Sequence, residues 1–321
     1  MNCLKNIKKD EIVWTRVKDS YYVEKITNAK YKYWNAWDKE KAEEFDIRHT
    51  KECHFYKVGG IDSVPGVIVN AFSRPSQTLC KIGNDKNNRR YTMSSLKIKD
   101  KRRNIECLKI EYDKLQEKYG AKELDSIYNG GCVENPDICF VFMNPTGKNI
   151  ASSKTWTGRK SPWLGTKNIW KLFNKVDLLS NDTYNKILEK KPKEWDYDFC
   201  DYVYDEIERN KVFITNLGKC TQIDARPLSN DVLKQYLDLL FEEIYIIKPK
   251  VVVTFGNQVS SIILNKRISV SENRKISHDL KVKDDTYKIF PVYYPVGNGI
   301  FNIDKSIEDI KWIMKKIGME W

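Results

Sequence analysis

The sequence has few histidines, no CxxC pair and no long apolar run, and each absence narrows the range of functions. His49, His54 and His278 are scattered, so no His/Cys cluster has the spacing of a metal site. The eight cysteines are dispersed, several in apolar contexts, which favours reduced thiols over a disulfide framework. Because no run reaches bilayer length and the N-terminus lacks a signal-peptide core, we expect a soluble cytoplasmic protein.

Motifs for nucleotide cofactors and for hydrolase triads are also missing. Neither GxGxxG nor a Walker sequence is present, and no serine and histidine are arranged as in a triad. We therefore expect no cofactor and no bound metal.

The chain is rich instead in positive charge and in aromatic rings. Its formal net charge is +12, and its 321 residues include 18 Tyr, 12 Phe and 9 Trp. Lysine and arginine suit a phosphate backbone and exposed rings suit bases, although such a charge also serves solubility alone. Charge alone therefore does not decide which partner the chain binds. The length leaves room for a sizeable core and two domains, and we expect a monomer that binds no membrane.

Residues 1–98 contain short β-rich runs separated by turn signals, which is typical of a small β-barrel. These runs are Glu11–Val17, Tyr21–Ile26, Tyr31–Trp34, Glu52–Val58, Gly66–Phe72 and Gln77–Ile82. The opening IVWTRVKDSYYVEKI resembles SH3-like barrels of the Tudor and PWWP kind. The whole region is similar to a module found ahead of bacterial restriction and defence effectors.

This resemblance implies that the first domain reads DNA or a modified base, because such barrels use aromatic cages or basic grooves. The candidate rings are Trp14, Tyr21, Tyr22 and Trp34. Packing in the core of the barrel is the alternative for each ring.

Residues 99–130 are predicted to form a helical connector, because apolar residues recur at helical spacing from Ile105 until Gly120. In residues 131–321, apolar strands alternate with amphipathic helices, which predicts an α/β domain with a parallel sheet. The expected strands are Ile138–Phe142, Lys211–Thr215, Val251–Phe255 and Lys288–Tyr293. One helix is expected after Ser229, and 180–200 is expected to be a surface excursion.

Polar residues follow these strands directly. Asn144 comes after the first strand, Asn216 after the second, and the loop 294–299 after the fourth. Ligands bind at the carboxyl ends of strands in open α/β sheets, so these residues are candidates for a site. An ordinary turn is the alternative for Asn144, and a helix cap for Asn216.

Five segments, in order, resemble the uracil-DNA glycosylase superfamily. They are FMNPTG, SPWLGTKNIWKLFNKVDLL, FITNLGKCTQIDAR, IKPKVVVTFG and YYPVGNG, spanning roughly residues 135–317. FMNPTG is similar to the first motif of the mismatch-specific and single-strand-selective branches, and the next three segments resemble the thermophilic iron–sulfur branch. The resemblance implies a three-layer α/β/α fold around a four-stranded parallel sheet.

The resemblance also implies roles for individual residues. Asn144 would position the attacking water, Trp163 would stack on a flipped base, and Asn216 would read its edge. The backbone around Met143 would complete the pocket, and the loop with Tyr294 would wedge into the duplex. The expected DNA contacts are Lys148, Arg159, Lys219, Val296, Gly297 and Asn298.

Two departures from the family pattern affect the prediction. Cys220 matches one of four cluster cysteines, but the N-terminal CxxC is missing and Tyr236 lies near another ligand position, so we expect no cluster. Tyr294 replaces a histidine that stabilises the leaving base, which argues for a damaged or hypermodified base, including phage-type bases, rather than plain uracil.

Two hypotheses follow. The first is a monofunctional DNA glycosylase that leaves an abasic site, with a possible anti-phage role. The second is a catalytically weak DNA-binding protein that reads modified DNA. The sequence alone places no lysine for a lyase reaction.

Overall fold

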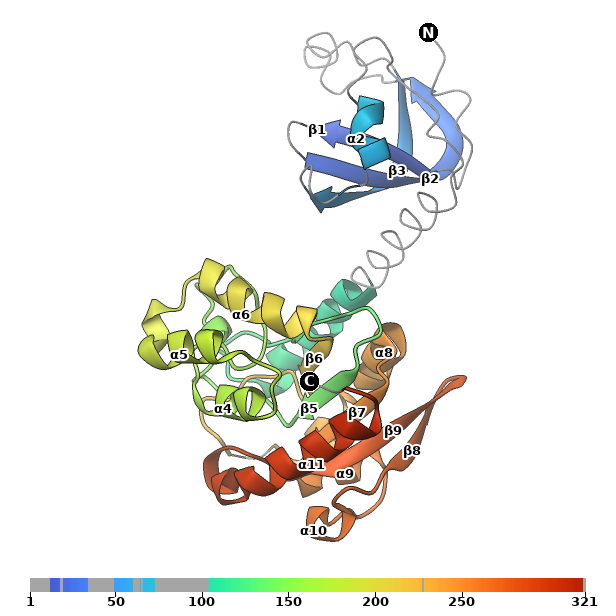
Figure 1. The fold of residues 1–321 in the computed structure, drawn as a ribbon. Helices are drawn as coiled ribbons and strands as arrows, with labels where there is room; N and C mark the ends of the chain where they lie inside the picture. The colour runs from blue at the N-terminus through green and yellow to red at the C-terminus, as the bar shows by residue number, and fades with distance from the viewer. Residues whose placement is uncertain are drawn as a thin grey trace. The chain divides into compact units, whose positions relative to one another are not determined.

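The computed structural model describes residues 12–17, 20–33, 49–59, 64, 66–72, 104–226 and 228–319. The chain divides into two units, Met1–Asp100 and Lys101–Trp321 (Figure 1). The helix over 104–119, expected as a connector, packs within the second unit through Tyr112, which lies in a buried cluster with Cys220 and Tyr236.

The described part of the first unit is a three-stranded antiparallel sheet and a short helix. The strands β1 (Ile12–Val17), β2 (Ser20–Tyr33) and β3 (His49–Gly59) lie in the order β1-β2-β3. The run Gly66–Phe72, predicted as a strand, is the helix α2. Its β-branched residues favour strands locally, but Ile68 is buried in the helix, so packing overrides propensity.

These elements give no support to the predicted SH3-like barrel. Tyr21 is 1% exposed and its ring packs edge-on against Phe72, so the prediction that Tyr21 reads a ligand is wrong. Trp14 and Tyr22 are half-buried, and their reader role stays a prediction. Trp34 and the predicted strand 77–82 lie outside the described residues.

The second unit is built on a six-stranded sheet in the order β4-β6-β5-β7-β9-β8. Its strands are β4 (Asn129–Gly131), β5 (Ile138–Phe142), β6 (Val212–Asn216), β7 (Val251–Phe255), β8 (His278–Val282) and β9 (Asp285–Val292). The four predicted strands are mutually parallel, and β4 and β8 pair antiparallel at the two edges. The prediction of four strands is therefore wrong in number and right about the parallel centre.

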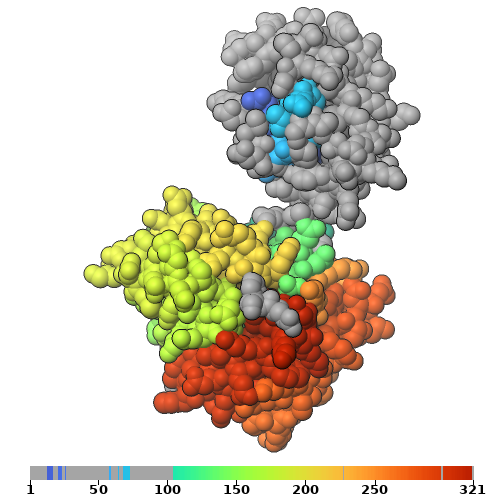
Figure 2. Space-filling model, in the orientation of Figure 1, coloured from blue at the N-terminus to red at the C-terminus, as the bar shows by residue number. Residues whose placement is uncertain are grey.

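Helices cover both faces of this sheet (Figure 1), and the central strands β5, β6 and β7 are therefore buried along their whole length. One apolar core joins the sheet to α4 (Asn168–Lys175), α5 (Asn181–Glu189), α6 (Tyr197–Arg209) and α11 (Ile303–Lys316). The other core joins it to α7 (Asn230–Lys234), α8 (Leu237–Ile247) and α9 (Asn257–Ile263). Figure 2 shows the yellow-green segment, which contains α4, against the red C-terminal segment, and α4 contacts α11.

Two helical predictions need correction. The helix expected after Ser229 is broken at Gln235 and Tyr236 into α7 and α8. The supposed surface excursion over 180–200 forms α5, the 3-10 turn η4 (Pro192–Glu194) and the start of α6. Ile187 and Trp195 anchor it in the core, so it is part of the fold.

Three smaller elements complete the described part of the second unit: η3 (Ile150–Ser152), α10 (Val270–Asn273) and η5 (Gly297–Asn302). Each described helix is too short or too polar to cross a lipid bilayer.

Candidate active site

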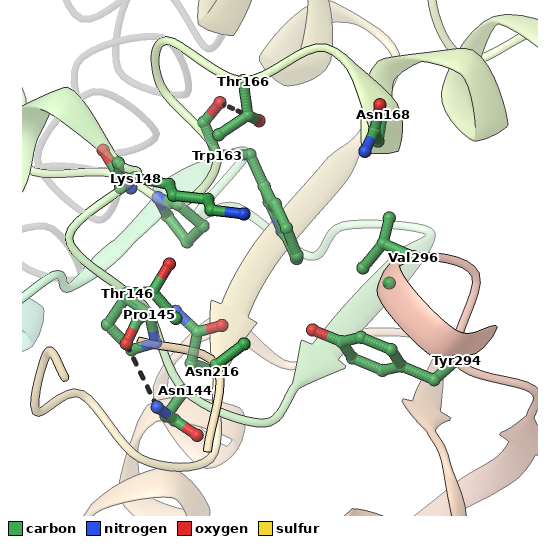
Figure 3. A pocket seen from close by; sticks show the side chains of 14 residues that line it. Asn144, Pro145, Thr146, Lys148, Trp163, Thr166, Asn168, Asn216, Tyr294 and Val296 are labelled. Carbon is green, nitrogen blue, oxygen red and sulfur yellow. Dashed lines mark hydrogen bonds between the residues drawn. The ribbon is translucent and has the colours of Figure 1, made fainter. Parts of the chain in front are cut away.

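A cavity of about 220 Å³ opens at the carboxyl edge of the parallel strands (Figure 3). Its walls come from the loops after β5, β6 and β9 and from the start of α4. The lining residues are Asn144, Pro145, Thr146, Lys148, Asn149, Pro162, Trp163, Thr166, Asn168, Asn216, Ala225, Tyr294, Val296 and Gly297. This is the edge at which doubly wound α/β sheets bind ligands.

Asn144 is held at the bottom of the cavity by its own turn. It is 8% exposed, and its Nδ2 donates to the Pro145 carbonyl at 3.1 Å. Its Oδ1 is buried with no hydrogen-bond partner among the described residues. Gly218 lies on the neighbouring loop, where a Cβ would be in ordinary contact with Asn144 Cβ at 3.5 Å and tight against the Leu233 side chain at 3.0 Å. One end of the amide is thus fixed and the acceptor end is unpaired.

Asn216 ends β6 beside Asn144. It pairs in register with Phe142 of β5, so the two asparagines follow neighbouring parallel strands. Asn216 is 2% exposed, and its Nδ2 has no hydrogen-bond partner in the described part of the chain. Both side chains line the same cavity, as predicted from the strand ends.

Trp163 forms a wall of the cavity in a strained backbone conformation. Its φ is +67°, a region that costs a bulky residue about 1–3 kcal/mol. Its carbonyl accepts hydrogen bonds from Thr166 N (3.1 Å), Thr166 Oγ1 (2.7 Å) and Trp170 Nε1 (3.3 Å), which offset the strain. The indole meets Phe142 edge-on with ring centroids 5.0 Å apart, and its Nε1 is buried and unpaired among the described groups.

Tyr294 faces the asparagines from the loop after β9. Figure 3 shows its hydroxyl pointing across the cavity toward Asn216. Burial raises the pKa of Tyr294 well above its ordinary value, so the hydroxyl keeps its proton. Gly299 is required behind it, because a Cβ at that position would lie 1.9 Å from the Tyr294 carbonyl oxygen.

Three lining side chains therefore bury an unpaired polar atom: one acceptor on Asn144 and two donors, on Trp163 and Asn216. Buried polar atoms are nearly always hydrogen-bonded, so several unpaired ones in one cavity indicate a site for a polar ligand. Water or the edge of a heterocyclic base supplies matching donors and acceptors.

The structure places the three cations that were predicted to hold phosphates in different environments. Lys148 is exposed and lines the cavity. Arg159 lies outside the lining and pairs with Asp201 at 2.8 Å. Lys219 is fully buried, 3.1 Å from Glu243 Oε2. The prediction that Lys219 contacts DNA is therefore wrong, because its charge is used inside the protein.

Of the remaining predicted site residues, some line the cavity and others do not. Val296 and Gly297 line the cavity, whereas Asn298 lies in η5 and its side chain is outside the described part. The Met143 side chain packs in the opposite core and its carbonyl accepts from Gly218 N at 2.8 Å, so it is not part of the cavity wall.

Sequence reasoning missed several lining residues and two exposed apolar ones. The missed lining residues are Pro145, Thr146, Asn149, Pro162, Thr166, Asn168 and Ala225. Phe301 is 89% exposed and Ile300 is 38% exposed, both in η5 next to the cavity. An apolar pair directly after the YYPVGNG loop was the signal that could have identified the tip of this loop.

The residues around Cys220 do not fit an iron–sulfur cluster. Such clusters need a set of cysteine ligands, but the buried neighbours of Cys220 are Tyr112 and Tyr236. No group of three metal-binding side chains was found among the described residues.

Comparison with known proteins adds two findings. The family model for the uracil DNA glycosylase superfamily matches residues 129–299, just over half of the chain. A type-4 uracil-DNA glycosylase from Sulfurisphaera tokodaii is 33% identical over 95 residues, which cover 28% of this chain and 43% of that protein. The similarity thus spans less than half the length of this relative.

Proposed function

Because the chain belongs to the uracil DNA glycosylase superfamily, we propose that it hydrolyses the N-glycosidic bond of uracil or of another aberrant or modified base in DNA. The base flips out of the stack into the cavity, and an abasic site remains. The observation that carries this proposal is the pair Asn144 and Asn216, two buried amides in one cavity that each hold an unpaired polar atom.

The cavity has the size and the groups to hold one base. Its volume of about 220 Å³ is several times what a single water needs, so it has room for a ligand larger than water. The Asn216 amide offers a donor and an acceptor, as a carbonyl–imide edge requires. Stacking on Trp163 adds about 1–3 kcal/mol.

Asn144 directs the attacking water. Bond cleavage builds positive charge on the sugar and negative charge on the leaving base. The unpaired Asn144 Oδ1 accepts a hydrogen from water and turns the water's lone pair toward the sugar. An amide is too weak a base to remove a proton early, which fits a path in which the sugar cation forms before water attacks.

Tyr294 donates its hydroxyl hydrogen to the leaving base. Burial raises its pKa, and a phenol is a donor below its pKa, so we expect the rate of base release to show no step from this residue between about pH 6 and 9. The Tyr294→His variant should acquire an inflection near pH 6.5, the ordinary pKa of imidazole. A Tyr294→Phe variant with unchanged rate would contradict this role.

Phe301 and Ile300 support flipping by inserting beside the extruded base. Apolar wedges unstack base steps, and Phe301 is 89% exposed next to the cavity. Phe301→Ala should slow base release from duplex DNA about tenfold, because stacking is worth about 1–3 kcal/mol, and should change single-stranded DNA little. Ile276→Ala, at another exposed apolar residue, is the matched control. Equal losses on both DNA forms would contradict the wedge.

The proposed activity is tested on oligonucleotides that each carry uracil or one modified base. We expect mass spectrometry to detect a released base, and alkali to cleave the strand at the new abasic site. Binding to DNA without any base release would favour the alternative, a reader of modified DNA. A defence role has no support in the described elements of the first unit.

A further inference from the structure

Among the described residues that line the cavity, Lys148 is the one whose side chain carries an amine. Its backbone is held on both sides, because Gly147 N donates to Gln222 O at 2.8 Å and Asn149 N donates to Thr146 O at 3.0 Å. Asn149 is 4% exposed, whereas the Lys148 side chain is exposed. The lysine is thus fixed at the rim of the cavity while its amine remains accessible.

No carboxylate among the described residues pairs with Lys148, in contrast to the other two cations that were predicted to hold phosphates. Arg159 pairs with Asp201, and Lys219 pairs with Glu243. Figure 3 shows the Lys148 side chain extending over the cavity toward Trp163. Lys148 thus lines the same cavity as Asn144 and Asn216, the two side chains proposed to act on the sugar and on the base.

From this placement we infer that Lys148 captures the abasic product as an imine, a step that follows base release and therefore rests on the proposed function. The abasic sugar opens to an aldehyde at C1′. The neutral Nζ attacks this carbon, two protons and the carbonyl oxygen leave as water, and an Nζ=C1′ double bond forms.

The imine also allows cleavage of the strand. Once protonated, it acidifies the C2′ hydrogen, whose proton passes to solvent water. The released electron pair forms a C2′=C3′ double bond, and the 3′ phosphate leaves with the electrons of the C3′–O bond. Hydrolysis of the imine then restores the lysine. The structure thus supplies the amine that the sequence alone did not place.

The test uses the full-length protein, a duplex with one ready-made abasic site, and cyanoborohydride to reduce the imine. We expect a covalent protein–DNA product whose adduct maps to residue 148 by mass spectrometry. Lys148→Ala and Lys148→Arg should both lose the product. Arginine keeps the positive charge, so its loss separates imine chemistry from phosphate binding.

Lys154→Ala is the matched control, because Lys154 is an exposed lysine in the same loop outside the cavity lining. This variant should retain the covalent product. Absence of the product in the natural protein, an adduct at another residue, or retention in Lys148→Ala or Lys148→Arg overturns the inference. Since the abasic site is supplied, such a result leaves the base-release assay untouched, and a failure of base release leaves the trapping result valid.

Discussion

Replacing Asn144 with alanine should lower the rate of base release by about 10²–10³-fold, the usual cost of removing one preorganised polar group from an active site. The variant loses the unpaired Oδ1 that orients water. It also loses one hydrogen bond to the Pro145 carbonyl. Single-turnover kinetics on a substrate found in the base-release screen measure the effect, and melting curves establish that the variant is folded.

Two further variants separate water positioning from general damage to the cavity. Asn144→Asp keeps an acceptor oxygen at the Oδ1 position, but its second oxygen replaces the donating Nδ2 and faces the Pro145 carbonyl. We therefore expect this variant to retain part of the activity that alanine loses. Asn168→Ala removes another amide from the lining, an exposed one. If Asn168→Ala were as damaging as Asn144→Ala, the effect would not report on the attacking water.

Replacing Lys219 with methionine should destabilise the second unit by about 3–5 kcal/mol, because it leaves a buried carboxylate without its counter-charge. Glu243 is 0% exposed and accepts hydrogen bonds from Asn129 Nδ2 and Thr215 Oγ1, both at 2.6 Å. The Tyr112 ring centroid lies 5.1 Å from the Lys219 amine. Urea unfolding followed by tryptophan fluorescence measures the loss.

The double variant Lys219→Met/Glu243→Leu should recover much of this stability, since replacing both charges by apolar groups removes the unpaired one. Lys186→Met, which breaks the exposed pair with Asp182, should have a negligible effect. The salt dependence of DNA binding should be the same in the folded Lys219→Met protein as in the natural one, because a buried lysine makes no phosphate contact. Each lost phosphate contact lowers the slope of log affinity against log salt concentration. A lower slope in Lys219→Met would therefore show that Lys219 does contact DNA.

The sequence predicted the parallel centre of the second unit well. β5, β6 and β7 are continuous apolar runs, and such runs are stable only when both faces are covered. Polar residues directly after them placed Asn144 and Asn216 at one edge of the sheet, because parallel strands share their direction. These two side chains do line one cavity.

Local patterns failed where neighbours distant in the sequence decide the outcome. β4 is Asn-Gly-Gly, a sequence with low strand propensity, and it pairs with β6 more than eighty residues later. Gly66–Phe72 has strand propensity but packs as a helix. The charge of Lys219 suggested the surface, yet Glu243 provides its partner inside the protein.

The amino-acid sequence by itself determined the parallel strands, their order along the chain and the asparagines that end two of them, because apolar runs and the turns after them act over a few residues. Only the tertiary structure decided which cations reach the cavity, which aromatic rings are buried, and that Lys148 and Phe301 lie exposed at the cavity or beside it. Burial and ion pairing depend on groups brought together from distant parts of the chain, and no local pattern encodes that proximity.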